Sequence, residues 1–114
     1  MRLKEFMQPG GKVDYQKDWN KISMNEKVQF IKGFLGKKGY TPPQIGAIVG
    51  NLLQENDTLV TSRENKTSRA LGIAQWLGPR KKALMSTGNP YNIVTQLEYL
   101  DKELRGNDHW TNNI

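Results

Sequence analysis

The sequence predicts a mainly α-helical fold, and three observations support this. Apolar residues recur at helical spacing in segments 23–38, 41–56 and 89–106. Capping residues or prolines begin these segments; Gly39 follows the first, and Gly106 ends the last. Residues 57–70 are polar and have no helical period, so they separate the second helix from a third that starts near residue 78. We therefore expect about four helices, with a long loop or a small β-hairpin between the second and the third.

The composition limits the classes of function. At 114 residues, the chain has the length of one domain. It has no cysteine and a single histidine, which excludes disulfides and argues against a zinc site of the Cys/His type, so we expect no metal and no cofactor. No stretch approaches the roughly 20 apolar residues of a membrane-spanning helix. The net charge of +6 favours a polyanionic partner, such as nucleic acid, an anionic membrane or an acidic cell wall.

We divide the chain into an irregular N-terminal arm or linker at 1–22, a helical domain at 23–106 and an irregular tail at 107–114. Pro9 and Gly10 interrupt any helix in the arm. The N-terminal sequence MRLKEFMQPGGK contains charges but no continuous apolar run, so it does not have the pattern of a secretory signal peptide. The tail has no helical period, so it is a candidate for the truncated end of a longer domain.

The first two helices begin with capping boxes. Ser23 and Glu26 have the S-x-x-E spacing, in which each side chain bonds the backbone of the other residue. Thr41 and Gln44 have the equivalent T-x-x-Q spacing, and Pro42 suits the first helical position. These signals predict helix starts at residues 24 and 42.

The second helix carries a carboxylate near its end. Its apolar residues, at positions 45, 48, 49, 52 and 53, lie on one face. At about 100° per residue, Glu55 projects from the edge of that face, beside Ile48 and Leu52. Apolar neighbours and the partial negative charge of a helix C-terminus both favour the protonated form of a carboxyl group. A general acid has to hold such a proton, so Glu55 is a candidate for that role.

The rest of the chain predicts a hairpin and two helices. Residues 59–61 and 70–76 are candidates for two short extended segments that pair. Pro79 begins the third helix, Pro90 begins the fourth, and Gly106 ends it. We expect two i, i+4 ion pairs on the last helix, Glu98 with Lys102 and Asp101 with Arg105.

Several signatures are absent from the sequence. There is no P-loop, no G-x-G-x-x-G motif after a strand, no H-E-x-x-H motif, no EF-hand loop and no G-x-S-x-G motif. The single histidine, His109, lies in the unpatterned tail, so a Ser-His-Asp triad has no support. The basic cluster at 80–82 leaves nucleic-acid binding open, but a solvated helix face explains it as well, so we do not expect nucleic acid as the partner.

Three segments together resemble a known family. They are GAIVGNLLQE at 46–55, GIAQWLGPR at 72–80 and QLEYLDKEL at 96–104, preceded by the entry KGYTP at 38–42. In this order they resemble the phage tail lysozyme family, which belongs to the lysozyme-like superfamily of peptidoglycan hydrolases. The resemblance covers residues 25–106 and implies a lysozyme-like fold at 23–106, with the active site between the helices and the loop.

The resemblance implies roles for several residues. Glu55 would be the general acid that protonates the glycosidic oxygen between the two amino sugars of peptidoglycan. Gln75 would line the sugar groove, and Asn51, four residues before Glu55, would lie near the acid or serve the helix surface. Trp76 would contact the sugar or pack inside the domain. Arg80 would bind acidic groups of the wall or hold the loop.

The second catalytic group stays open. Muramidases with two carboxylates take the second from the hairpin region, where Glu64 is the better candidate and Asp57 the weaker one. Other relatives use one Glu alone, which would include lytic transglycosylases. The family usually has Ser after the catalytic Glu, whereas this chain has Asn56, so the exit from the helix differs.

We therefore expect a muramidase that cleaves the β-1,4 bond of peptidoglycan and acts on the bacterial cell wall from a phage tail. Its expected partners are peptidoglycan and other phage tail proteins. The alternatives are a lytic transglycosylase with a single Glu and a non-catalytic wall-binding or structural tail module. A basic helical nucleic-acid binder is the third and weakest hypothesis.

Overall fold

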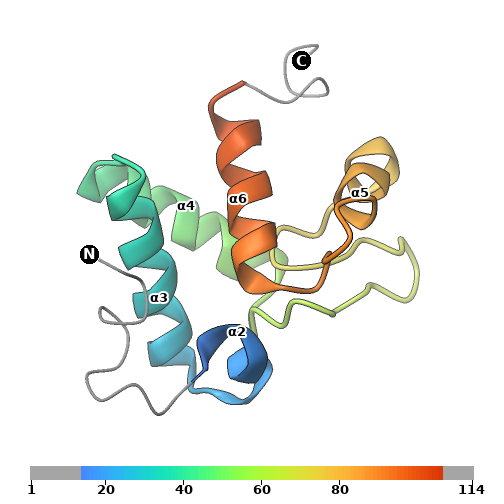
Figure 1. The fold of residues 1–114 in the computed structure, drawn as a ribbon, viewed down its shortest axis with the longest axis horizontal. Coiled ribbons are helices and arrows are strands. Elements are labelled where there is room, and N and C mark those ends of the chain that lie inside the picture. The colour runs from blue at the N-terminus through green and yellow to red at the C-terminus, as the bar shows by residue number, and fades with distance from the viewer. Residues whose placement is uncertain (1–13, 107–114) are drawn as a thin grey trace.

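The computed structural model describes residues 14–106; the tail at 107–114 and residues 1–13 of the predicted arm lie outside the described residues. The described part is mainly helical, as predicted (Figure 1). Its elements are α2 (Tyr15–Asp18), a 3-10 turn (Trp19–Lys21), α3 (Met24–Lys37), α4 (Pro42–Glu55), α5 (Gly78–Met85) and α6 (Ile93–Leu104). No helix in this part is long and apolar enough to cross a membrane.

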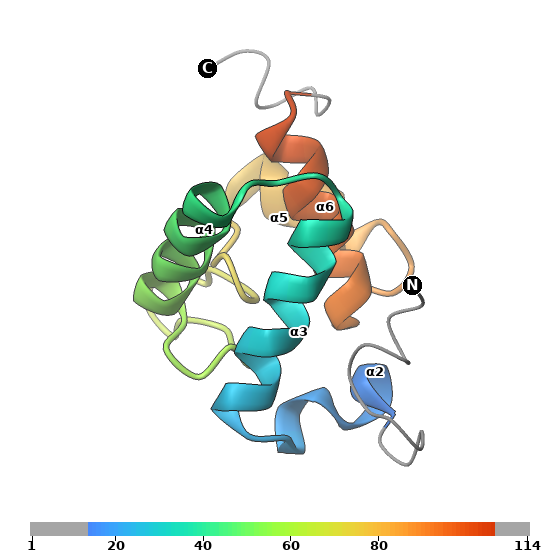
Figure 2. The same ribbon diagram turned by 90° about the vertical axis from the view of Figure 1, so that its left-hand side faces the viewer.

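Helices α3 and α4 pack side by side as a helical hairpin (Figures 1 and 2). Both predicted capping boxes are present: the side chain of Ser23 accepts from the backbone of Glu26, and that of Thr41 accepts from the backbone of Gln44. Gly39 has a φ of +98°, which suits the left-handed residue that ends a helix. The two helices therefore begin where their capping signals predict.

Residues 14–22 pack into the domain, which corrects the irregular arm predicted for this segment. Asp14 caps the short helix α2 by accepting from two backbone N–H groups. Tyr15 and Trp19 are buried, and Trp19 Nε1 donates to the carbonyl oxygen of Leu59 at 2.7 Å. The indole meets the ring of Phe30 edge-on, with 5.4 Å between ring centroids. One turn of helix is too short for its periodicity to be detected in the sequence.

Between α4 and α5 the chain forms a long loop, and the alternative of a hairpin is not found. In the described residues, pairing is limited to two isolated antiparallel bridges, Glu64 with Leu71 and Leu71 with Trp76. The segment at 59–61 forms no strand: turns lie at 57–58 and 61–62, and Leu59 between them is buried with a φ of +54°. Burial of Leu59 thus overrides the local preference for a strand.

Helix α6 begins three residues later than Pro90 predicts. The side chain of Asn92 accepts from the backbone N–H groups of Val94 and Thr95, so Asn92 is the N-cap. Ile93, Leu97 and Leu100 are buried in the hydrophobic core. Gly106 follows the helix with a φ of +72°, as predicted for its stop residue.

Candidate active site at the end of helix α4

Glu55 is the last residue of α4 and is exposed. The apolar face beside it is shallow, because Ile48 and Leu53 are only partly buried, whereas Leu52 is fully covered. The partial burial predicted for Glu55 is therefore not found in the free chain. Its carboxyl group is instead accessible to a substrate.

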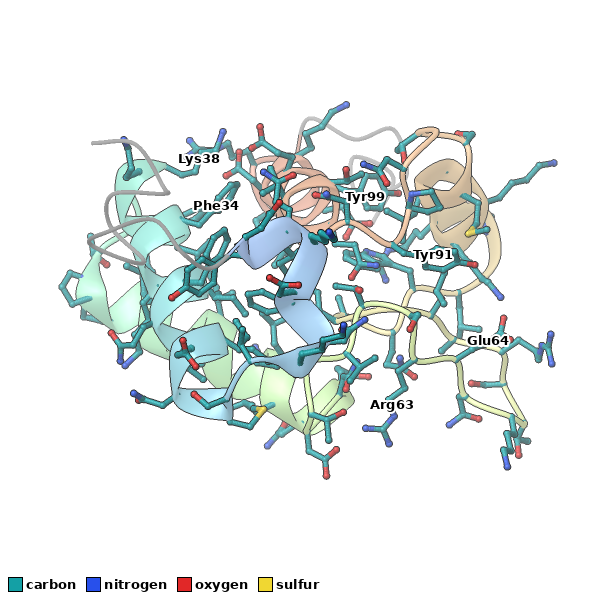
Figure 3. All side chains as sticks on the ribbon, turned by 60° about the horizontal axis from the view of Figure 1, so that its bottom comes forward. Phe34, Lys38, Arg63, Glu64, Tyr91 and Tyr99 are labelled. Carbon is teal, nitrogen blue, oxygen red and sulfur yellow. The ribbon has the colours of Figure 1, made fainter. Side chains whose placement is uncertain are left out.

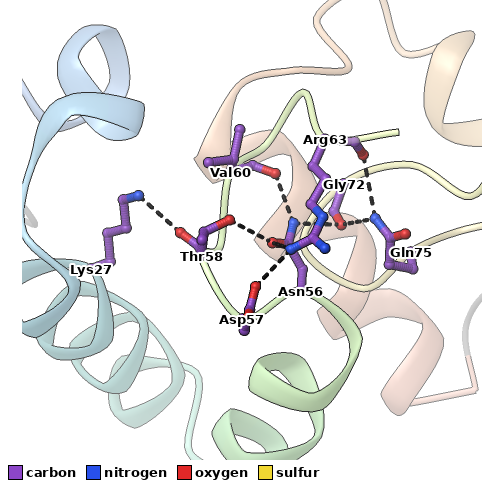
Figure 4. Close-up of polar contacts among 8 residues, drawn as sticks. All are labelled: Lys27, Asn56, Asp57, Thr58, Val60, Arg63, Gly72 and Gln75. Atoms are coloured by element: carbon purple, nitrogen blue, oxygen red, sulfur yellow. Dashed lines mark hydrogen bonds and ion pairs between the residues drawn. The ribbon is translucent and has the colours of Figure 1, made fainter. Parts of the chain in front are cut away.

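The next residue, Asn56, joins the helix end to the long loop. Its side chain is 0 % exposed. Nδ2 donates to the carbonyl oxygens of Val60 at 2.8 Å and Gly72 at 3.1 Å. Oδ1 accepts from the hydroxyl of Thr58 at 3.1 Å and from Arg63 Nη1 at 3.3 Å (Figure 4). Both donors and both acceptor positions are used, so this buried amide fixes the path of the chain directly after Glu55.

Gln75 is held beside Asn56 by a shared acceptor. Its Nε2 donates to the carbonyl oxygen of Gly72 at 2.9 Å, the same atom that accepts from Asn56, and to that of Arg63 at 3.3 Å (Figure 4). Gln75 is partly buried and has a φ of +52°, an uncommon conformation for a residue other than glycine. The fold thus brings the predicted groove residue next to the end of the helix that carries Glu55.

Lys27 supports the same turn from α3, and the sequence analysis did not single it out. Its side chain is almost fully buried, and Nζ donates to the carbonyl oxygen of Thr58 at 2.9 Å (Figure 4). Burial lowers the pKa of this ammonium group. The helical period of α3 offers no signal for this role, because the partner lies 31 residues away.

Glu64, the predicted second carboxylate, is bound by two cations. Lys81 Nζ lies 2.6 Å from Oε2, and Arg69 lies 3.1 Å from Oε1. The hydrogen bond from Lys81, with the nearby charges, holds the pKa of the Glu64 carboxyl below its usual value. Figure 3 shows Glu64 on the part of the loop that lies toward α5. In the free chain, this carboxylate therefore connects the loop to α5.

Two other predicted binding residues differ in accessibility. Trp76 is 0 % exposed and packs against Tyr99, so the structure places it in the core, as the packing alternative expects, where it presents no surface to a sugar. Asn51 is exposed on α4, four residues before Glu55, and its role near the acid stays a prediction.

Helix α6 binds the loop through two buried polar side chains, Gln96 and Glu103. Gln96 accepts from the backbone N–H of Ile73 at 3.0 Å and donates to the carbonyl oxygens of Thr61 at 2.9 Å and Pro90 at 2.7 Å. A Cβ atom on Gly72 would lie 2.9 Å from Gln96 Oε1, so glycine permits this close approach.

Glu103, which lies on the same helix as Gln96, binds the end of the loop. It accepts from Trp76 Nε1 at 2.8 Å and from Arg80 through Nε at 2.6 Å and Nη2 at 2.8 Å. Arg80 therefore holds the loop, which is one of the two roles that the resemblance implies. Gln96 and Glu103 of the third motif therefore support the second motif, GIAQWLGPR at 72–80.

The family model of phage tail lysozymes matches residues 26–113. The chain belongs to the phage tail lysozyme family. All three motifs of this phage tail lysozyme lie inside the matched range. Membership makes it a lysozyme-like protein, and peptidoglycan is its substrate class. Comparisons with curated proteins and with solved structures gave no match. Within residues 14–106, no cluster of three or more His, Cys, Asp or Glu side chains could hold a metal ion.

Proposed function

We propose that this phage tail lysozyme is a muramidase that cleaves the β-1,4 bond between N-acetylmuramic acid and N-acetylglucosamine. One observation carries the proposal: Asn56 and Gln75 donate to the same carbonyl oxygen of Gly72. This arrangement joins the end of α4, with its accessible Glu55, to the G-I-A-Q-W segment that the family resemblance assigns to the sugar groove.

In the proposed reaction, Glu55 donates its proton to the glycosidic oxygen as the bond to the anomeric carbon breaks. A saccharide bound across the end of α4 would cover the exposed carboxyl group and remove water from it. Desolvation favours the neutral acid, so the bound substrate itself would help to keep the proton on Glu55. Gln75 and Asn51 would contact the sugar on either side of the acid.

The second catalytic group is proposed less directly. Glu64 would serve as the second carboxylate only after giving up its contacts with Lys81 and Arg69, which hold it in the free chain. This observation favours a second candidate, in which Glu55 acts alone with help from the substrate, as in a lytic transglycosylase. The two candidates differ in the product and can be separated by mass.

Digestion of purified peptidoglycan, followed by mass spectrometry of the soluble fragments, tests the proposal. A muramidase releases fragments that have gained one water at a reducing N-acetylmuramic acid. A lytic transglycosylase releases fragments lighter by one water, which would support the second candidate. The absence of fragments at full binding to the wall would contradict both and favour a non-catalytic tail module.

We also propose that the protein acts from the phage tail, opening the wall locally. The net charge of +6 supports attraction to an anionic cell wall. Labelling purified particles with an antibody against the chain tests this location. Signal at the tail supports it, and absence from intact particles contradicts it.

A further inference from the structure

Arg63 lies beside the two residues that follow Glu55. Its Nη1 donates to Asp57 Oδ1 at 2.7 Å and to Asn56 Oδ1 at 3.3 Å (Figure 4). Asn56 is fully buried and has all its hydrogen bonds, so this contact anchors one edge of the guanidinium group. The side chain of Arg63 nevertheless stays 46 % exposed.

The remaining edge of the guanidinium group is open to a ligand. Within residues 14–106, no hydrogen bond involves Nε or Nη2 of Arg63. A guanidinium fork binds a carboxylate through two parallel N–H donors, which a lysine does not reproduce. Asp57, its present partner, is 79 % exposed, and an ion pair of this kind contributes little to stability. Both structural contacts of the Arg63 side chain thus use Nη1, and they leave Nε and Nη2 without an assigned role.

Other cations of α3, the loop and α5 are less suited to a ligand. Lys27 reaches the same turn, but it is 4 % exposed and already donates to the carbonyl oxygen of Thr58. Arg69 and Lys81 are engaged by Glu64. Of these cations, Arg63 combines contact with the residues after Glu55 and access to solvent.

We propose that Arg63 is a specificity residue that binds a carboxylate of the muramyl unit of the glycan. This inference rests on the proposed function, because it assumes that the saccharide crosses the end of α4. The carboxylate comes from the lactyl group where the sugar carries no peptide, and from the stem peptide where it does. A chitin chain of the same length has neither, so Arg63 would distinguish peptidoglycan from a neutral polymer.

Binding is measured by calorimetry on the full chain carrying Glu55→Gln, so that no probe is cleaved. The probes are a peptide-free tetrasaccharide of alternating N-acetylglucosamine and N-acetylmuramic acid, the same tetrasaccharide with stem peptides, and the tetramer of N-acetylglucosamine. Arg63→Gln and Arg63→Lys are added to this background. Lys66→Gln, an exposed lysine in the same loop, is the matched control for loss of one positive charge.

We expect the preference for a muramyl probe over the neutral tetramer to fall about tenfold in Arg63→Gln, as for loss of one hydrogen-bonded charge pair. Arg63→Lys recovers part of the preference, and Lys66→Gln retains it. A fall confined to the peptide-free probe assigns the lactyl carboxylate, and one confined to the other probe assigns the stem peptide. An unchanged preference in Arg63→Gln, or an equal fall in Lys66→Gln, overturns the proposal. Mass spectrometry of the probes after calorimetry tests the proposed function separately: cleavage by Glu55→Gln would contradict the role of Glu55, whereas intact probes with an unchanged preference would overturn only the role of Arg63.

Discussion

The indole N–H of Trp76 donates to the buried carboxylate of Glu103 at 2.8 Å, across 27 residues of sequence. The same carboxylate accepts two hydrogen bonds from Arg80, so one side chain of α6 holds both ends of the segment 76–80. This segment follows Gln75, whose side chain lies next to Asn56 at the end of α4. The position of Gln75 in the candidate site thus depends on the contacts of Glu103 with Trp76 and Arg80.

Glu103→Ala is expected to lower the free energy of unfolding by about 3 kcal/mol, because it leaves the indole N–H buried without its acceptor and separates a partly buried ion pair. This value is at the low end for such pairs, since Arg80 is 41 % exposed and can be hydrated. Urea unfolding at neutral pH measures the change.

Glu98→Gln is the matched control for Glu103→Ala. It removes an exposed carboxylate on the same helix, which pairs with Lys38 at 2.6 Å, and should cost less than about 1 kcal/mol. Equal losses in the two variants would contradict the role assigned to Glu103.

Gly72→Ala should destabilise the protein by about 2 kcal/mol, for two separate reasons. Gly72 has a φ of +85°, and a Cβ there would lie within 3.1 Å of three side-chain atoms of Gln96. Gly88→Ala separates the two effects, because Gly88 has a φ of +90° but a Cβ there would meet nothing within 4 Å. Thermal unfolding should show a larger fall for Gly72→Ala than for Gly88→Ala, and the reverse order would contradict the close approach.

Acid should weaken the attachment of the loop to α5. The folded-state pKa of Glu64 lies below its ordinary value of 4.5, mainly because Lys81 donates to its carboxylate. Its contribution to stability is therefore complete above the unfolded pKa and is lost as the pH falls through the lower folded value. Glu64→Gln should show a smaller loss of stability below pH 4.5 than the wild type in unfolding experiments.

Part of the acid sensitivity should remain in Glu64→Gln. Burial raises the pKa of Asp101, but hydrogen bonds from Arg105 and Tyr40 outweigh it, so that pKa is also lowered. The same linkage then applies to Asp101. Identical pH profiles for the wild type and Glu64→Gln would contradict the contribution of Glu64.

Asn56→Asp tests the junction after Glu55. The variant keeps both acceptor contacts but loses the two donors and places a carboxylate against the carbonyl oxygens of Val60 and Gly72. We expect a loss of about 2–4 kcal/mol in stability, because the variant buries a carboxylate against these two carbonyl oxygens, which keep only the backbone N–H groups of Arg63 and Gln75 and Nε2 of Gln75 as donors. Hydrogen exchange should also become faster in residues 57–72. Unchanged exchange there would contradict the role of Asn56 in fixing the path of the loop.

Local signals in the sequence predicted the helices well. The capping boxes at Ser23 and Thr41 and the ion pair of Asp101 with Arg105 are all present, because each involves residues within one turn. Glu98 pairs with Lys38 rather than with Lys102, since the start of the α3–α4 turn lies beside α6. Only the folded chain provides that neighbour.

The site was predicted as a set of residues but not as a geometry. The motifs predicted Glu55 and Gln75 as site residues. The hydrogen bonds that join their segments are instead made by Asn56 and Gln75 to the carbonyl oxygen of Gly72. Gln96 is polar, yet it is completely buried, because its amide donates to the carbonyl oxygen of Thr61. That partner lies 35 residues away, so no local pattern reveals it. Such contacts depend on tertiary packing, which periodicity and capping do not encode.

The most direct test is the clearing of purified peptidoglycan by the wild type, Glu55→Gln and the control Glu98→Gln at equal concentration. Circular dichroism and thermal unfolding establish that all three are folded. If Glu55 is the general acid, Glu55→Gln should clear the wall about 100-fold more slowly or worse, and Glu98→Gln should match the wild type. Clearing by Glu55→Gln at the wild-type rate would contradict the assignment of this site.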